Sequence, residues 1–269
     1  MDFRFGLVAG NARTGTEWVA TARRAEELGY DTLLVPDTLH TLSPFAALAA
    51  AAAGTTTLRL GTYVLSAPNR SPGLVAWETR SLQLLSGGRF ELGIGGGRPG
   101  AERDAAALGG DFGTPGERLR RVADTIRTVR EGAGAPPILV AASRPGMLRL
   151  AADQADIVAL GLPPQSSEDE LAAMVATLGD RAGAVELHVN VAAVAETADD
   201  VPEWLSRMVG GDPREMARAG GIAFLLGGPG EIAETLLRRR AELGISYIGV
   251  SGLFMEQFAP VIDLLREAG

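Results

Sequence analysis

Eight short apolar runs recur along the chain, and a segment with helical periodicity separates each run from the next. The runs are Phe5–Ala9, Thr32–Val35, Leu58–Leu65, Phe90–Ile94, Ile138–Ala141, Ile157–Leu160, Leu187–Val194 and Tyr247–Val250. In the segments between them, apolar residues return every three or four positions, as in Leu119, Val122, Ile126 and Val129. Strands that alternate with helices predict a parallel sheet, because each parallel connection needs a crossover that is usually a helix.

This alternation predicts a single (β/α)8 TIM barrel domain over residues 1–269. The length of 269 residues suits that fold, which typically takes ~250, and no Ser-, Pro- or Gly-rich linker divides the chain. A doubly wound parallel sheet is the alternative. Two segments exceed a plain barrel, namely residues 95–114 after the fourth strand and residues 198–226 after the seventh. We expect both to be insertions.

Several helix starts are marked by a capping residue followed by proline at the first helical position. These pairs are Ser43-Pro44, Ser71-Pro72, Thr114-Pro115 and Gly228-Pro229. Thr114 with Glu117, and Ser166 with Asp169, also have the spacing of a capping box. The pairs therefore predict where five of the helices begin.

Composition excludes several classes of function. The formal net charge is −8 and all 25 basic residues are arginine, which argues against non-specific nucleic-acid binding and excludes lysine chemistry. Cysteine is absent, so no disulfide or thiolate site can form. The longest apolar run, Phe45–Ala53, is far shorter than the ~20 residues of a membrane span. No signal-like segment opens the chain, and we expect a cytoplasmic protein with a small-molecule substrate and neither a nucleic-acid nor a membrane partner.

The residues that follow the strands indicate a ligand site. In a barrel of this kind, strand C-termini and helix N-termini meet at one end, where active sites lie and anions bind. The candidates are Asn11 and Arg13 after the first strand, Asp37, Thr38 and His40 after the second, Gly95, Gly96, Gly97, Arg98 and Arg103 after the fourth, and Ser143, Arg144, Pro145 and Gly146 after the fifth.

These candidates predict a site for a planar, phosphate-bearing ligand. The three consecutive glycines allow a flat ring to approach the backbone closely; a mobile surface loop is the alternative interpretation. Asn11, Arg13, Arg98 and Arg103 would form a polar, cationic wall. Such a wall favours an acidic or carbonyl-rich substrate.

The chain has only two histidines, and they lack the spacing of a zinc site, so we expect no bound metal. His40 is either an acid/base group or a polar residue on an exposed loop. His188 alternates with Leu187 and Val189 in the seventh strand. We therefore expect His188 to fill a polar layer inside the barrel.

Two segments carry a resemblance to a known family. Thr55–Leu65 leads into Asn69-Arg70-Ser71-Pro72, and Leu85–Gly93 reads Leu-Ser-Gly-Gly-Arg-Phe-Glu-Leu-Gly before Gly95-Gly96-Gly97. The chain thereby resembles the luciferase-like monooxygenase superfamily, especially its coenzyme F420-dependent oxidoreductase branch. The resemblance extends over nearly the whole chain, and the Leu-Ser-Gly-Gly-Arg-Phe-Glu-Leu-Gly segment is its most specific part.

The resemblance implies a flavin or deazaflavin at the C-terminal end of the barrel. It implies a non-prolyl cis peptide at Tyr63–Val64 beneath the ring, with Asp37 and Thr38 beside the ring. The phosphate-bearing tail would lie on the segment 143–146. Thr38 stands where the family's sugar-phosphate dehydrogenases have histidine, and Arg98 where they have an acidic residue. Gly96 and Gly97 replace a basic residue of the flavin-binding luciferases, which favours coenzyme F420 over FMN.

The expected function is therefore hydride transfer between coenzyme F420 and a small organic substrate, with His40 as general acid and Asp37 as the residue that orients the ring. An FMN-dependent two-component monooxygenase is the alternative within the superfamily. A phosphate-substrate lyase or isomerase, and a cofactor-free barrel that serves as a binding subunit, are alternatives of other classes. The resemblance also implies a homodimer through the segment Ala46–Ala53, although that segment could instead pack on the barrel.

Overall fold

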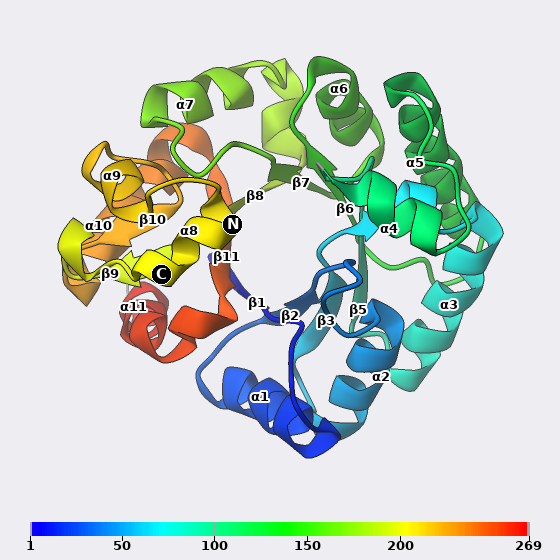
Figure 1. The fold of residues 1–269 in the computed structure, drawn as a ribbon, viewed down its shortest axis with the longest axis horizontal. Coiled ribbons are helices and arrows are strands. Elements are labelled where there is room, and N and C mark those ends of the chain that lie inside the picture. The colour runs from blue at the N-terminus through cyan, green and yellow to red at the C-terminus, as the bar shows by residue number, and fades with distance from the viewer. Residues whose placement is uncertain (1, 99, 268–269) are drawn as a thin grey trace.

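A closed parallel barrel forms the centre of the computed structural model, which describes residues 2–98 and 100–267. Figure 1 looks along the barrel, with helices around it. Within those residues, its strands are β1 (Arg4–Val8), β2 (Thr32–Val35), β3 (Arg59–Thr62), β5 (Phe90–Gly95), β6 (Ile138–Ala142), β7 (Ile157–Leu160), β8 (Glu186–Val191) and β11 (Ile245–Ser251). The pairings of β1 with β11 and of β3 with β5 close the sheet. The predicted TIM barrel is confirmed.

Helices cover the outer face of the barrel. They are α1 (Gly15–Glu27), α2 (Pro44–Gly54), α3 (Pro72–Leu85), α5 (Pro115–Arg130), α6 (Pro145–Gln154), α7 (Glu168–Ala176), α10 (Pro229–Leu243) and α11 (Met255–Glu267). Proline opens α2, α3, α5 and α10 as predicted, and Thr114 with Glu117 forms the predicted capping box. The predicted box of Ser166 and Asp169 is wrong by one residue. Ser167 and Glu170 form it instead, while the Ser166 carbonyl accepts a hydrogen bond from the Ile222 N–H.

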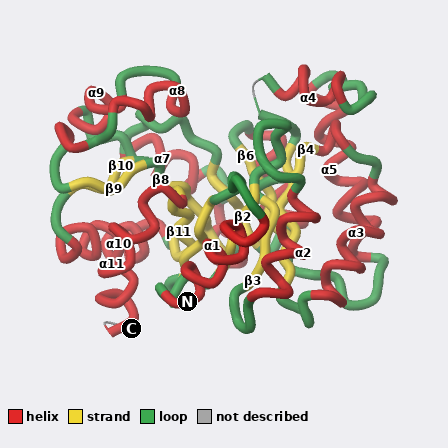
Figure 2. Tube along the Cα trace, turned by 60° about the horizontal axis from the view of Figure 1, so that its bottom comes forward, coloured by secondary structure: helices red, strands yellow, loops and turns green. Residues whose placement is uncertain are grey.

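Both predicted insertions are present. After β5 comes α4 (Ala101–Ala107), and after β8 come β9 (Ala193–Ala195), α8 (Ser206–Val209), α9 (Pro213–Arg218) and β10 (Phe224–Leu226). β9 and β10 pair in parallel as a separate small sheet. Short 3-10 turns also occur: η1 (Ala67–Asn69), η2 (Gly179–Ala184), η3 (Ala198–Asp200), η4 (Glu203–Leu205) and η5 (Gly252–Phe254). Figure 2 shows α4 on one side, and α8 and α9 on the other, above the same end of the barrel.

Two of the predicted strands are divided in the structure. The run Leu58–Leu65 becomes β3 and the short β4 (Leu65–Ser66), which are separated by a cis peptide bond between Tyr63 and Val64. The cis bond implied by the resemblance is thus confirmed. The run Leu187–Val194 becomes β8 and β9, because the chain leaves the barrel after Val191 to pair with β10.

A network of charges closes the N-terminal end of the barrel. Arg4 places Nη2 2.7 Å from Glu91 Oε2 and Nη1 2.5 Å from Glu186 Oε2. The Tyr247 hydroxyl donates to Glu91 Oε1 at 2.8 Å, and the Arg4 guanidinium lies 4.2 Å from the centre of the Tyr247 ring. Only 1% of the Glu91 side chain is exposed. Four residues from four strands therefore fix the base of the barrel.

The Glu26 carboxylate fastens α1 to the segment before β3, and it makes stability depend on pH. Burial alone raises the pKa of Glu26, but hydrogen bonds from the N–H groups of Thr57, Leu58 and Thr56 outweigh burial and lower it to about 2. A lowered folded-state pKa means that the stabilisation is present above the unfolded value of 4.5 and is lost as the pH falls toward 2.

We therefore expect the Glu26→Gln variant to be less stable than the parent at pH 7, with the difference shrinking as the pH falls from about 4.5 toward 2. Urea unfolding at a series of pH values, monitored by circular dichroism, measures this difference in unfolding free energy. Glu27→Gln, at an exposed neighbour on the same helix, is the control. A stability difference that stays constant across this range would contradict the prediction.

Among the described residues, no helix is both long enough and apolar enough to cross a membrane.

Candidate functional site

Partly exposed side chains form the floor of the barrel mouth, the end at which the strands terminate. Val8, Tyr63, Val64 and Ala141 pack on a buried interior cluster. That cluster consists of Leu34, Leu139, Ile157, Ala159 and Tyr247. The mouth therefore has an apolar floor with the Tyr63 ring in it.

The glycine run Gly95, Gly96 and Gly97 forms one side of the mouth. A Cβ on Gly95 would lie 3.0 Å from Val64, and one on Gly97 would lie 2.8 Å from the Phe112 ring. Gly97 also has φ +92°, which disfavours any side chain. Beside it, the Ser66 hydroxyl is buried and has no hydrogen-bond partner within residues 2–98 and 100–267. This side of the mouth thus consists of backbone without side chains, and the buried Ser66 hydroxyl lies beside it.

The first turn of α6 offers a second polar surface at the mouth. Ser143, Arg144 and Pro145 are exposed, and Gly146 is partly exposed. Arg144 is the N-cap residue, and within residues 2–98 and 100–267 no side chain caps the helix. The N–H groups of the first turn consequently remain available, at the end of the helix where the dipole favours an anion.

Asp37 lies at the end of β2, but its carboxylate is already engaged. It forms an ion pair with Arg70 Nη1 and accepts a hydrogen bond from the Ser66 N–H at 3.0 Å. The side chain is only 7% exposed. Asp37 therefore holds the end of β4 against the end of β2. Next to it, the Thr38 hydroxyl lies 3.3 Å from the Thr41 hydroxyl.

His40 lies on the same loop and is exposed. The loop itself is braced, because the Thr41 hydroxyl donates to the Pro36 carbonyl at 3.1 Å and the Leu42 N–H donates to the Gly10 carbonyl at 2.8 Å. His40 makes no hydrogen bond or ion pair with any residue that the structure describes. The loop on which His40 lies is therefore fixed, whereas the His40 ring is not fixed by a bond to any described residue.

The four residues expected to contact substrate are distributed around the rim. Asn11, Arg13, Arg98 and Arg103 are all exposed. Arg13 Nε lies 3.4 Å from Glu17 Oε2, and Arg98 Nη2 lies 2.7 Å from Asp104 Oδ2. Two of the three expected cations therefore already have acidic partners on the following helix.

His188 occupies the barrel interior, as the alternation in β8 predicts. It is 0% exposed and lies between the Tyr63 ring, at 4.9 Å, and the Tyr247 ring, at 4.7 Å. Burial and the nearby Arg4 cation lower the pKa of His188 to about 3, although a hydrogen bond to its own backbone carbonyl acts in the opposite direction. The contact of His188 with Tyr63 was not predicted, because it joins side chains 125 residues apart.

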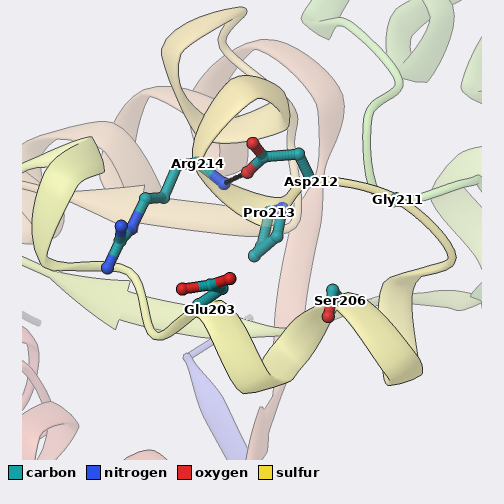
Figure 3. A pocket seen from close by; sticks show the side chains of 6 residues that line it. All are labelled: Glu203, Ser206, Gly211, Asp212, Pro213 and Arg214. Atoms are coloured by element: carbon teal, nitrogen blue, oxygen red, sulfur yellow. Dashed lines mark hydrogen bonds between the residues drawn. The ribbon is translucent and has the colours of Figure 1, made fainter.

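A surface pocket of about 470 Å³ lies in the second insertion, away from the glycine run and α6. Glu203, Ser206, Gly211, Asp212, Pro213 and Arg214 line it (Figure 3). Asp212 accepts from the Arg214 N–H at 2.8 Å as the cap of α9, and Arg214 Nε donates to the Val201 carbonyl at 3.0 Å. Asp212 and Arg214 thus serve to hold the insertion together.

Comparison with known proteins gives a consistent result. The pattern of a family described as luciferase-like monooxygenase matches residues 3–219. A 5,10-methylenetetrahydromethanopterin reductase from Methanolobus tindarius is 27% identical over 194 residues, which cover 65% of this chain and 59% of that protein. A 4-hydroxyprotoasukamycin monooxygenase from Streptomyces nodosus subsp. asukaensis is 32% identical over 162 residues, 49% of this chain and 42% of that protein. The chain thus spans about half the length of the curated relatives it matches.

A solved structure has the same fold over its whole length. The coenzyme F420-dependent tetrahydromethanopterin reductase from Methanopyrus kandleri superposes with a TM-score of 0.73, covering 97% of each chain at 15% sequence identity. At that identity the likeness concerns the fold alone.

Proposed function

Because this chain belongs to the luciferase-like monooxygenase family, we propose that it is an oxidoreductase that transfers a hydride between coenzyme F420 and a small organic substrate. The observation that carries the proposal is the mouth itself. A run of three glycines and an uncapped helix N-terminus open onto the same end of the barrel. Such a pair suits a ligand with a flat ring and an anionic tail.

The residues present fit a deazaflavin. Gly95, Gly96 and Gly97 would let the ring approach the backbone, and the unsatisfied Ser66 hydroxyl beside Gly97 is available to a polar ring atom. Ser143, Arg144 and the first turn of α6 would hold the phosphate of the tail. When bound, the cofactor supplies the hydride chemistry. The chain supplies orientation, through the floor around Tyr63 and the loop braced by Asp37 and Arg70, and a titratable group on that loop, His40.

Titration of the purified chain with coenzyme F420, FMN and NADPH tests the proposal. We expect F420 to bind with micromolar affinity and the other two ligands to bind more weakly. The fluorescence of the deazaflavin reports F420 binding. Micromolar FMN binding without F420 binding would replace the proposal with an FMN-dependent two-component monooxygenase, which the 32% identical monooxygenase relative favours. Binding of sugar phosphates alone, or of none of these ligands, would indicate a lyase, an isomerase or a binding subunit.

The Arg144→Ala variant should bind the cofactor about 10- to 150-fold more weakly, since a charge-assisted hydrogen bond to phosphate contributes about 1.5–3 kcal/mol. The effect should shrink at high salt, because added ions screen exposed charges. Fluorescence titration at low and high salt measures both. Arg149→Ala, at an exposed arginine farther along α6, is the matched control. Equal affinities of the Arg144 and Arg149 variants would contradict the assignment of the tail site to α6.

We propose that the chain forms a homodimer through α3 rather than through the segment Ala46–Ala53. Much of that segment packs inward, with Ala47, Leu48, Ala51 and Ala52 buried. On α3, by contrast, large apolar side chains are exposed at helical spacing: Leu74 at 39%, Trp77 at 62% and Leu84 at 83%. Two antiparallel copies of α3 would place Leu74 against Leu84 and Trp77 against the smaller Ser81, which suits interdigitation.

We expect sedimentation velocity to show a species of twice the 28.0 kDa chain mass, and the Trp77→Glu variant to shift it to the monomer, since a charge in an apolar interface is costly. Trp204→Glu, at another tryptophan that is 50% exposed, should stay dimeric. A parent protein that sediments as a monomer would exclude the dimer.

A further inference from the structure

A column of polar aromatic side chains runs through the barrel from its charged base to its mouth. At the base, the Tyr247 hydroxyl on β11 donates a hydrogen bond to Glu91 on β5, and the Tyr247 ring contacts the Arg4 guanidinium on β1. Above it lies His188 on β8, and next comes Tyr63, which follows β3. β3 and β8 are not neighbours in the sheet, so the contact between Tyr63 and His188 crosses the barrel. Tyr63 is the member of the column that is partly exposed at the mouth.

The surroundings of His188 determine its charge. The groups that face it are Arg4 from β1, whose charge Glu91 from β5 partly balances, together with Tyr63 and Tyr247. Burial and the Arg4 cation both disfavour a second positive charge, so the pKa of His188 falls to about 3. The imidazole is therefore neutral at physiological pH and carries one proton, on either Nδ1 or Nε2.

The hydrogen-bond partners place that proton on Nδ1. Nε2 is buried and has no partner among the described residues, and it lies 2.7 Å from where a Cβ on Gly249 would stand. A buried N–H without an acceptor costs more than a bare ring nitrogen, so the proton belongs on Nδ1, which has an oxygen within reach, and not on Nε2. The Tyr63 oxygen lies 3.4 Å from the same Nδ1. With the proton on Nδ1, that oxygen is an acceptor toward His188, and its own hydrogen is directed elsewhere.

We propose that His188 is a positioning residue that holds the Tyr63 oxygen from below, so that the Tyr63 hydroxyl donates a hydrogen bond to an uncharged carbonyl oxygen of a substrate in the mouth. Burial raises the pKa of the Tyr63 phenol, which keeps its proton in place as a donor. The substrate class rests on the proposed oxidoreductase function; the direction of the hydrogen bond from His188 to Tyr63 does not.

The uncharged character of the ligand follows from the same surroundings. A neutral imidazole and a neutral phenol offer no charge to balance a carboxylate, and the side chains around them are apolar. Arg4 is committed to Glu91 and Glu186 at the base. At the rim, Arg13 and Arg98 are paired with Glu17 and Asp104. With Arg4, Arg13 and Arg98 committed to carboxylates, the neutral pair of Tyr63 and His188 favours a ketone or aldehyde over an acidic substrate.

Nitrogen NMR of the full chain labelled with 15N-histidine tests the hydrogen bond directly, because the chain has only two histidines. The His188→Gln variant assigns the signals. We expect His188 to stay neutral from about pH 5 to 8 with its proton on Nδ1, and Tyr63→Phe to move the Nδ1 signal while leaving that of His40 unchanged. Tyr30→Phe, which removes a hydroxyl bonded to the Met255 carbonyl, should move neither signal.

A matched pair of small probes tests the ligand class. Butanone and propionate have similar shapes but differ in charge, and we expect only butanone to shift the His188 signals, with about fivefold weaker binding to the Tyr63→Phe variant. A proton on Nε2, a charged His188 at pH 6, or propionate binding as tight as that of butanone would each overturn the proposal, as would a butanone affinity that Tyr63→Phe leaves unchanged. Neither measurement needs the cofactor, so failure to bind F420 would remove the proposed function without affecting the hydrogen-bond assignment.

Discussion

The Arg4→Ala variant should lose about 3–5 kcal/mol of unfolding free energy, the cost of removing one partner of a buried ion pair. Arg4 forms ion pairs with both Glu91 and Glu186, whose side chains are 1% and 13% exposed. Burial already raises the pKa of Glu186, and Arg4 opposes that rise. Removing the guanidinium would leave two carboxylates close together at the base of the barrel, with Arg59, whose Nε lies 3.5 Å from Glu91 Oε2, as the remaining cation beside Glu91. Urea unfolding, monitored by circular dichroism, measures the loss.

The control for this variant is Arg127→Ala. Arg127 forms an exposed pair with Asp124 on the surface of α5, with side-chain exposures of 66% and 47%. Exposed pairs of this kind contribute about 0–1 kcal/mol. If Arg4→Ala were no more destabilising than Arg127→Ala, the network at the base would not be a main support of the fold.

The His40→Ala variant should lower turnover by about 10²- to 10⁴-fold while leaving cofactor affinity unchanged, if His40 is the general acid that the sequence predicts. In the structure, His40 lies on a braced loop at the mouth, and its ring is exposed and makes no hydrogen bond to any described residue. A ring in that state can turn toward a bound substrate, and catalytic hydrogen bonds often tighten only in the complex. Stopped-flow measurement of deazaflavin oxidation, with a separate fluorescence titration, gives the rate and the affinity.

Leu39→Ala provides the control, because Leu39 is the preceding residue on the same loop and is 50% exposed. The pH dependence of turnover adds a second measurement. A loss below about threefold for His40→Ala, with an unchanged pH profile, would mean that solvent supplies the proton and that His40 is only a loop residue.

The fold could be predicted from the sequence because its signals are local. β2 has the predicted bounds, Thr32–Val35, since a buried parallel strand is a nearly continuous run of apolar and β-branched residues. The run Leu58–Leu65 was less informative, because apolar residues continue through the cis bond that divides β3 from β4. Likewise, Ser166 and Ser167 both have an acidic residue three positions later. In the folded chain Ser167 caps the helix, while the Ser166 carbonyl accepts from the distant Ile222 N–H.

The site could be predicted only in part, because its partners come from distant segments. Asp37 was found as a polar residue at a strand end, but Arg70, which takes up its charge, is 33 residues away. The pairing of Arg98 with Asp104 is closer in sequence, and the acidic residue on the following helix was a usable signal. The link between Tyr63 and His188 needs the barrel to close before it exists.

The position of the charged network has an evolutionary consequence. Arg4, Glu91, Glu186 and Tyr247 lie at one end of the barrel, whereas the insertions that carry α4, α8 and α9 lie above the other (Figure 2). A lineage can therefore lengthen or exchange an insertion, and so acquire a new substrate, without disturbing the residues that keep the strands together.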